Sequence, residues 1–178
     1  MPSKQESPKS MSELTQLINK KHQWLLSQVD VTFPTPESIL GRDLYIKHEN
    51  TISYKLLDVD DGLDSSLLDD LYLVDFHRLT VMFSQLQALQ WEDKREQEFV
   101  LEFFAQIILS DQHDLYVGFK NNQAIIGAIL TEDKLGHLLI SDVASLTHHC
   151  CLTRLFYSKV MEQYNHRNSA IKAMYVPV

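Results

Sequence analysis

The sequence contains little glycine: only five of its 178 residues are glycine, whereas roughly 7% is usual in globular proteins. No two of these glycines lie within five residues of each other. Nucleotide-binding loops of the G-x-G-x-x-G or G-x-x-x-x-G-K type need clustered glycines, because these let backbone N–H groups approach phosphate. The sequence therefore excludes a dinucleotide-binding fingerprint and a P-loop.

Cysteine, positive charge and long apolar runs are also scarce. The two cysteines, Cys150 and Cys151, are adjacent, which does not fit a framework of separated disulfide bonds. The net charge of −8 argues against nucleic-acid or anionic-membrane binding, since an acidic surface repels phosphate. No apolar run approaches the roughly 20 residues of a membrane span, and no apolar signal-peptide segment occurs at the start. We expect a soluble cytoplasmic protein with no nucleic-acid or membrane partner.

The length predicts one domain, because domains commonly contain about 100–200 residues. Residues 1–10 are polar and predict a disordered tail, which leaves residues 11–178 as the domain. Apolar residues at helical spacing predict a helix over residues 12–28, and two prolines near residue 35 would end it. Alternating apolar and polar residues predict a half-buried strand over residues 51–57.

Six aspartates gather between residues 58 and 70. A calcium loop of the EF-hand type needs glycine at its sixth position and a bidentate carboxylate at its twelfth. In a loop that starts at Asp58, Gly62 falls at the fifth position and Asp69 takes the place of the final glutamate. We therefore expect a solvated acidic loop here, and we predict no metal site in the chain.

The remaining residues alternate between helical and strand patterns. Apolar spacing predicts helices over residues 74–90, 94–109 and 147–163, and strands over residues 115–119, 124–130, 137–143 and 170–176. The aromatic stripe within the second of these helices is interpreted as core packing rather than a ligand-binding wall. Asn121 and Asn122 tolerate positive φ and suit a tight hairpin turn. The order predicts an α/β protein of the α+β type, with local hairpins rather than repeated βαβ units.

This order of elements resembles the core of the GNAT acyl-CoA N-acyltransferases over about residues 50–176. The hairpin over residues 116–130 (YVGFKNNQAIIGAIL) is similar to the second and third strands of that family. Gly127 stands where the third strand of the family often carries glycine. The resemblance implies a GNAT-like mixed, mostly antiparallel sheet flanked by helices, with an extra N-terminal helix.

The resemblance also implies a cofactor, acetyl-CoA or another acyl-CoA. In the family, backbone amides of a Gln/Arg-x-x-Gly-x-Gly/Ala loop after the fourth strand hold the pyrophosphate. The corresponding positions here, which the resemblance implies as cofactor-binding, are Val143, Ser145, Thr147, His148, His149 and Cys150. Residues 145–153 contain no glycine. By the same resemblance, Asp142 could act as general base toward an amine; its structural alternative is to cap the following loop.

The tetrad His148-His149-Cys150-Cys151 carries side chains that zinc prefers as ligands. A zinc site would need a further histidine brought in by the fold, and a nucleophilic cysteine would need a partner base. The simplest interpretation is that both cysteines are small buried apolar residues and that the histidines occupy the first helical turn.

Two functions remain open. The first is an acyl-CoA-dependent N-acyltransferase that acts on a small-molecule or protein amine, with pantetheine between residues 137–143 and 170–176. The second is a non-catalytic GNAT-like binding or regulatory module that has lost the acyl-CoA loop. The missing glycines favour the second, as does the end of the sequence two residues after Val176, before the helix and strand with which family members usually continue. An exposed sheet edge there would allow homodimerisation by strand pairing.

Overall fold

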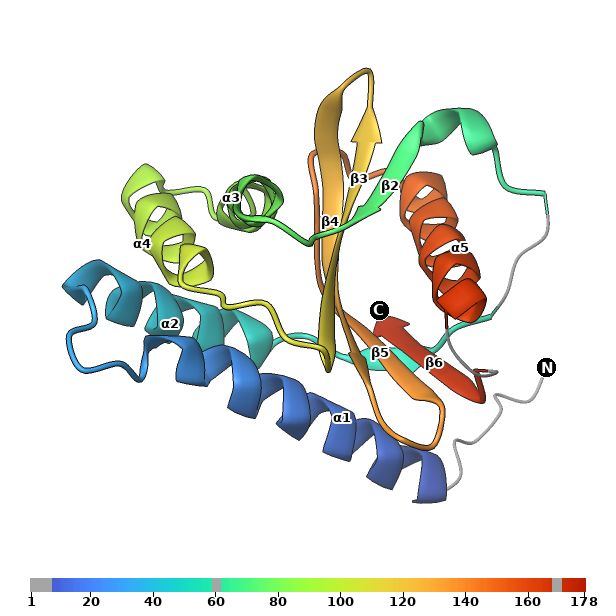
Figure 1. The fold of residues 1–178 in the computed structure, drawn as a ribbon, viewed down its shortest axis with the longest axis horizontal. Coiled ribbons are helices and arrows are strands. Elements are labelled where there is room, and N and C mark those ends of the chain that lie inside the picture. Colours follow the sequence, from blue (N-terminus) through green and yellow to red (C-terminus); the bar gives the residue numbers. More distant parts are fainter. Residues whose placement is uncertain (1–7, 59–61, 168–170) are drawn as a thin grey trace.

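The protein is described from a computed structural model that covers residues 8–58, 62–167 and 171–178. It contains a six-stranded, mostly antiparallel sheet with helices on both faces (Figure 1). The fold class is therefore the α+β type expected from the sequence, and it is consistent with a GNAT-like fold.

The described residues form five α-helices: α1 (Pro8–Leu26), α2 (Pro36–Glu49), α3 (His77–Ala88), α4 (Lys94–Ala105) and α5 (Cys150–Arg167). The side chain of Thr35 accepts a hydrogen bond from the Ser38 amide at the start of α2, and Asp93 does the same for two amides of α4, as capping residues should. Four helices were predicted with shifted ends, and α2 was missed. Because α1 begins at Pro8, part of the predicted tail is helical; residues 1–7 lie outside the described residues.

The strands are β1 (Tyr54–Leu56), β2 (Asp70–Leu73), β3 (His113–Lys120), β4 (Gln123–Glu132), β5 (His137–Ser145) and β6 (Ala173–Pro177). They lie in the order β1-β6-β5-β4-β3-β2, and only the β5–β6 pair is parallel. The β3–β4 hairpin turns at Asn121 and Asn122, with φ of 49° and 62°. Both residues thus adopt the positive φ expected of them.

The strand predicted over residues 51–57 is shorter in the structure, and it pairs with β6 at one edge of the sheet. The strand next to β3 is β2, which the sequence analysis missed. The exposed edge expected after the last strand is also wrong, because β1 covers β6. The hydrogen bond from the Val178 amide to the Ser53 carbonyl extends this pairing.

The aspartates between residues 58 and 70 make different contacts, and residues 59–61 lie outside the described residues. Asp64 caps a short 3-10 turn, while Asp69 binds Lys120 at 2.5 Å and the Asn121 amide at 2.8 Å. Asp69 therefore braces the β3–β4 hairpin instead of standing free in solvent. Among residues 8–58, 62–167 and 171–178, no three His, Cys, Asp or Glu side chains are grouped as a metal site would require.

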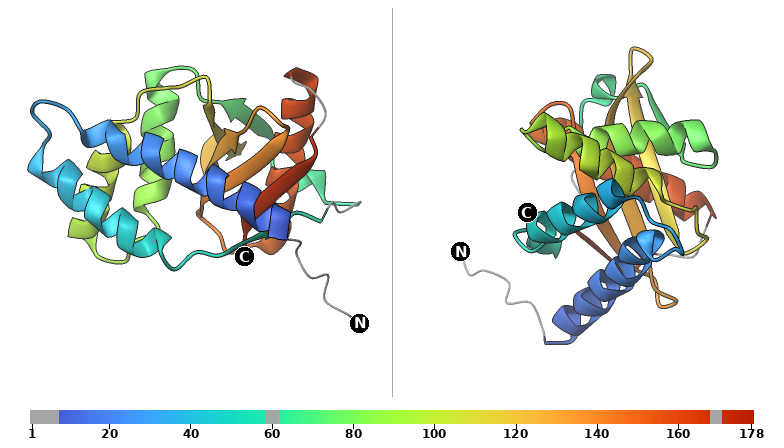
Figure 2. Two further views of the ribbon diagram at one scale, coloured as in Figure 1. Left: turned by 90° about the horizontal axis from the view of Figure 1, so that it is seen from below. Right: turned by 90° about the vertical axis from the view of Figure 1, so that its left-hand side faces the viewer.

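Helix α3 packs on one face of the sheet, with α4 and α2 beside it, and α1 lies on the same face over β4 and β5. Helix α5 covers the other face (Figure 2). Phe103 and Phe104 are fully buried in the helical core, in agreement with the core interpretation of the aromatic stripe. Gly41 allows α2 to approach α4 closely: a Cβ at that position would lie 1.9 Å from the Phe99 carbonyl oxygen. Within the described residues, no helix combines the length and apolar character needed to cross a membrane.

Candidate functional site

A β-bulge in β5 determines where the Asp142 side chain points. The β4–β5 register passes from Ile129–Ser141 to Gly127–Ala144, so Ala128 lies opposite two residues of β5. Asp142 adopts φ of 53°, which Asp tolerates better than most residues. A regular strand would alternate faces and direct this side chain toward α5. The bulge instead turns the Asp142 side chain toward α1 and α2. The side-chain amide of Gln87 donates a hydrogen bond to the backbone carbonyl of Asp142 at 2.5 Å.

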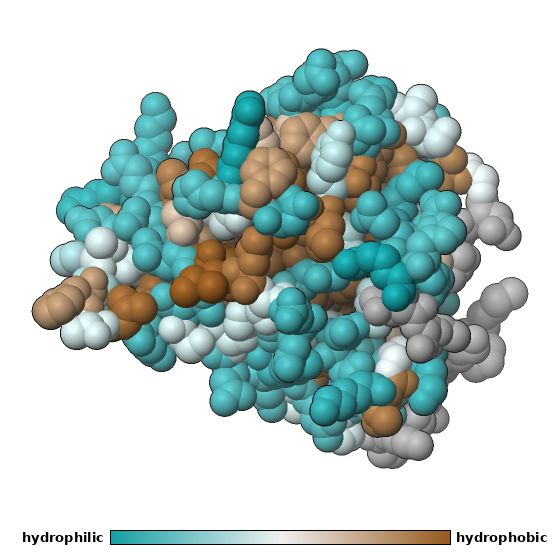
Figure 3. Space-filling view, in the orientation of Figure 1, coloured by the Kyte–Doolittle hydropathy of each residue, from teal (hydrophilic) through white to brown (hydrophobic). Residues whose placement is uncertain are grey.

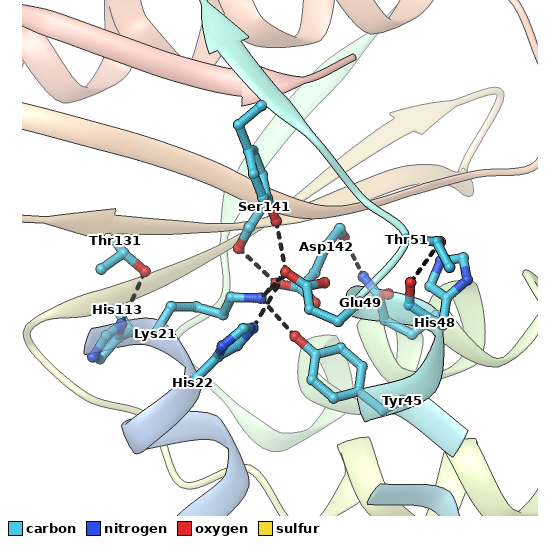
Figure 4. Close-up of polar contacts among 12 residues, drawn as sticks. Lys21, His22, Tyr45, His48, Glu49, Thr51, His113, Thr131, Ser141 and Asp142 are labelled. Atoms are coloured by element: carbon cyan, nitrogen blue, oxygen red, sulfur yellow. Dashed lines mark hydrogen bonds and ion pairs between the residues drawn. The ribbon is translucent and has the colours of Figure 1, made fainter. Parts of the chain in front are cut away.

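A buried lysine meets this carboxylate. Lys21 of α1 is fully buried, and its Nζ lies 2.6 Å from Tyr45 Oη, 2.7 Å from Glu49 Oε1 and 3.2 Å from Asp142 Oδ2 (Figure 4). A lysine ammonium has three hydrogens to donate, and three acceptors surround it here. Ser141 Oγ donates to Asp142 Oδ2 at 2.6 Å. The Asp142 side chain is only 1% exposed.

Glu49 completes the cluster from the last turn of α2. Tyr54 donates a hydrogen bond to Glu49 Oε1 at 2.7 Å, and His22 Nε2 lies 3.4 Å from the same oxygen. Burial alone would raise the pKa of Glu49, but the His22 ring, the Lys21 ammonium and the Tyr54 hydroxyl together lower that pKa to about 2. Glu49 is therefore ionised at neutral pH, so the cluster holds a buried charge pair.

Burial and the neighbouring negative charges keep the two tyrosines protonated. Burial first, then the charges of Asp142 and Glu49, raise the pKa of Tyr45 and of Tyr54 well above the ordinary value. Both phenols are consequently neutral hydrogen-bonding groups at physiological pH. They surround the Lys21–Glu49–Asp142 cluster without adding charge to it.

The sheet opens beside Asp142. The parallel pairing of β5 with β6 ends at Leu139–Tyr175, although β5 continues to Ser145. A cavity of about 70 Å³ lies at this opening, and Asp142, Val143 and Glu49 are among its lining residues. Each water molecule occupies about 30 Å³ in the liquid, so the cavity has room for only a few water molecules.

The other predicted cofactor-binding residues lie along the exposed connection from β5 to α5. Ser145 Oγ donates to the Thr147 carbonyl at 2.8 Å, and Thr147, His148, His149 and Cys150 are exposed. None of these five residues lines the cavity beside Asp142. Of the six predicted cofactor-binding residues, Val143 is the one that does. The structure therefore brings Asp142 together with Val143, and it leaves the other five along the surface connection.

The cysteines and histidines of the tetrad differ from their expected positions. Cys150 is exposed and Cys151 is half-buried, so neither is the fully buried apolar residue that was expected. His148 and His149 precede α5 instead of forming its first turn. The physical reason is that the apolar face of α5 begins at Leu152, which is 4% exposed and packs on the sheet.

Sequence reasoning missed Lys21 and Glu49, because charged residues normally lie on the surface. A signal was present in each helix. Lys21 stands midway between the buried Leu17 and Leu25, on the same face at i, i+4 spacing. Glu49 follows the buried Tyr45 at the same interval. A charged residue in the middle of a buried helical stripe indicates a buried partner of opposite charge.

Comparison with known proteins gives matches in structure alone. No protein-family model and no curated protein matches the sequence. Similar solved structures include a functionally unknown conserved protein from Staphylococcus epidermidis ATCC 12228, with 12% identity and a TM-score of 0.47 over 76% of this chain and 55% of that chain. Another is a GCN5-related N-acetyltransferase from Kribbella flavida, with 9% identity and a TM-score of 0.45 over 76% of this chain and 53% of that chain. The chain thus spans about half the length of each.

Proposed function

We propose that this chain is a non-catalytic GNAT-like binding or regulatory module, whose acceptor site is filled by its own lysine. The observation that carries the proposal is the contact of Lys21 Nζ with Asp142 Oδ2 at 3.2 Å. A general base must be within hydrogen-bond reach of the amine that it deprotonates. Here the Asp142 carboxylate already contacts the Lys21 ammonium. Ser141 Oγ donates a hydrogen bond to the same carboxylate oxygen.

The small space beside Asp142 supports this proposal. An acyl-pantetheine arm is far larger than a cavity of about 70 Å³, and ligand pockets usually measure about 300–1,000 Å³. The connection over residues 145–149 has no glycine, so side chains crowd the amides that would have to approach a pyrophosphate. Both features disfavour acyl-CoA in the mode of the family that the sequence resembles.

Apolar surface on one face is compatible with a binding role. Figure 3 shows brown surface in the middle of this face that continues toward its left-hand end, with hydrophilic residues above and below it. Exposed large apolar side chains include Ile108 at 74% and Leu109 at 39%, both in the segment that joins α4 to β3. Contiguous apolar surface with a polar rim is typical of sites that bind other molecules. A protein or a small effector is the partner class that the module would take.

The second candidate function is an acyl-CoA-dependent N-acyltransferase, and the geometry of β5 favours it. The bulge places the Asp142 carboxylate at the opening between β5 and β6, and α5 begins five residues after the end of β5. The N-terminus of a helix attracts anions such as pyrophosphate. In this function acetyl-CoA or another acyl-CoA would donate an acyl group to an amine, and Lys21 would have to withdraw from Asp142.

A thermal-shift experiment with acetyl-CoA and longer acyl-CoAs separates the two functions. Binding to the native state alone, at a hundredfold excess over Kd, stabilises a protein by about 2.7 kcal/mol. For a chain of this size, that corresponds to roughly 5–11 °C in Tm. The proposed module shows no shift at millimolar cofactor, and the Asp142→Asn variant behaves in the same way. A saturable shift in the wild type would overturn the module and favour the acyltransferase.

The proposal extends to a homodimer through strand pairing at one of the two sheet edges, β1 or β2. Unpaired strand edges present N–H and C=O groups to any strand that approaches. Light scattering over a concentration series tests this assembly, and a constant monomer mass throughout the series contradicts it.

A further inference from the structure

The two cysteines at the start of α5 contact each other. Cys150 is the first residue of the helix and Cys151 the second, and their Sγ atoms lie 3.9 Å apart. Consecutive side chains on an α-helix point about 100° apart, so both side chains must turn toward each other for this contact. Cys150 is exposed and Cys151 is half-buried, so a small reagent in solvent can reach the pair.

We propose that Cys150 and Cys151 are a redox-modification site that forms a reversible disulfide between adjacent residues, with a low-molecular-weight disulfide such as oxidised glutathione as the oxidant. This proposal does not rest on the function proposed above. It adds a covalent chemistry to the connection between β5 and α5, where the sequence predicted only buried thiols, a zinc ligand set or a nucleophile.

The reaction proceeds by two thiol–disulfide exchanges. The thiolate of Cys150 attacks one sulfur of oxidised glutathione, which forms a mixed disulfide and releases one glutathione thiolate. The thiolate of Cys151 then attacks the Cys150 sulfur, which forms the Cys150–Cys151 bond and releases the second glutathione. The two protons lost by the protein thiols end on the two glutathione thiolates. The protein dithiol is thus oxidised by two electrons, and oxidised glutathione is reduced by two.

Exposure sets the order of attack. Cys150 is the more exposed thiol, so it meets the oxidant first. Cys151 is in hydrogen-bond contact with Cys150, and this contact raises the pKa of the Cys151 thiol. With its Sγ 3.9 Å from that of Cys150, Cys151 is already placed to resolve the mixed disulfide.

The disulfide must distort the first turn of α5. The two sulfurs have to move from 3.9 Å to about 2.05 Å. Adjacent Cα atoms are about 3.8 Å apart, which is closer than the 4.4–6.8 Å usual for disulfides. The helical hydrogen bond from the Thr153 amide to the His149 carbonyl, at 3.2 Å, spans the pair and should weaken. Leu152 is 4% exposed and anchored in the core, so the distortion should end there.

Strain of this kind makes a disulfide easily reduced. The oxidised form should therefore accumulate only when oxidised glutathione exceeds the reduced form, and millimolar reduced glutathione should return it to the dithiol. This behaviour is that of a responsive modification site and not that of a structural crosslink, which resists the glutathione pool.

The test incubates the full chain at neutral pH with mixtures of oxidised and reduced glutathione and follows intact mass after acid quenching. We expect the loss of two hydrogens, with the bond mapped between Cys150 and Cys151 in a single peptide. In the matched variants Cys150→Ser and Cys151→Ser, one glutathione adduct should accumulate instead, because no second thiol resolves it. Circular dichroism of the reduced variants checks that both remain folded.

Hydrogen exchange supplies an independent readout. Oxidation of the wild type should increase amide exchange at Thr153 at least several-fold, while the same oxidant leaves that amide unchanged in the two serine variants. A stable glutathione adduct on the wild type, a disulfide-linked dimer, or a fully reduced chain under a large excess of oxidised glutathione would overturn the proposal.

Discussion

Replacing Lys21 by methionine removes the ammonium from the buried cluster while keeping most of the apolar length of the side chain. Two carboxylates, Glu49 and Asp142, then remain buried without the cation that they share. Removal of one partner from a buried ion pair typically costs about 3–5 kcal/mol. Lys21 is one of three groups, after His22 and with Tyr54, that lower the pKa of Glu49 to about 2, so its loss also removes part of that stabilisation. We therefore expect Lys21→Met to lower the free energy of unfolding by about 3–5 kcal/mol at neutral pH.

The loss should depend on pH. Because the folded-state pKa of Glu49 is lowered, its ionised form stabilises the folded protein above about pH 4.5, and this contribution disappears as the pH falls toward 2. Lys21→Met lacks the cation that contributes to this lowering. The difference in unfolding free energy between wild type and variant should be largest above about pH 5 and should shrink on acidification.

Urea unfolding at several pH values, followed by circular dichroism, measures this difference. Lys47→Met is the matched control, because Lys47 is exposed on α2 and should change stability by less than about 0.5 kcal/mol. Asp142→Asn in the Lys21→Met background removes one uncompensated charge and should recover part of the loss. A cost below about 1 kcal/mol, or the same cost at neutral pH and near pH 3, would refute the assignment of Lys21 to a stabilising buried pair.

Two further predictions concern the helical side of the sheet. Gly41→Ala would place a Cβ 1.9 Å from the Phe99 carbonyl oxygen, so α2 and α4 must separate; urea unfolding should report a loss of about 3 kcal/mol, and a neutral substitution would contradict the close approach. The ring of His113 stacks on that of Trp24, with 4.3 Å between the ring centroids. Burial, and after it the charge of Lys20, lowers the pKa of His113 from 6.5 to about 4. Neutral His113 thus stabilises the fold above about pH 6.5, and this stability is lost as pH falls toward 4. An NMR titration should place the midpoint near 4, and a midpoint near 6.5 would contradict the burial.

The helices and the central hairpin could be predicted because their signals are local. Apolar residues at helical spacing mark α3 and α4, and Asn121 with Asn122 marks the β3–β4 turn. Helix α2 was missed because its buried side includes Ser38, Gly41 and Glu49, which do not form an apolar stripe. The pairing of β1 with β6 was not predicted, because the two strands are far apart in the sequence and no local pattern encodes their pairing.

The candidate site also has a part that local sequence predicts and a part that it does not. Asp142 could be selected from its place at the end of the strand predicted over residues 137–143, but the turn of its side chain toward α1 depends on a bulge that the sequence pattern does not show. Asp142 pairs with Lys21 of α1, which also pairs with Glu49 of α2. The charges of Lys21 and Glu49 resemble ordinary surface charges until the packing of both helices is known. Local sequence therefore predicts the carboxylate, whereas the fold determines which group it contacts.

The pairing of β1 with β6 has a consequence for the order in which the protein can fold. Tyr54 pairs with Pro177 and Leu56 pairs with Tyr175, so the closing of this edge joins segments at a large sequence separation. Such contacts form late, because the entropy of closing the intervening loop is lost before the contact is gained. During synthesis, β6 emerges from the ribosome after β1 to β5, and it is the strand that joins β1 to β5 in the sheet. Strand β1 therefore has no partner strand to pair with before β6 is complete. We expect β1 to remain unpaired until then, so the slow step of folding should follow completion of residues 173–177.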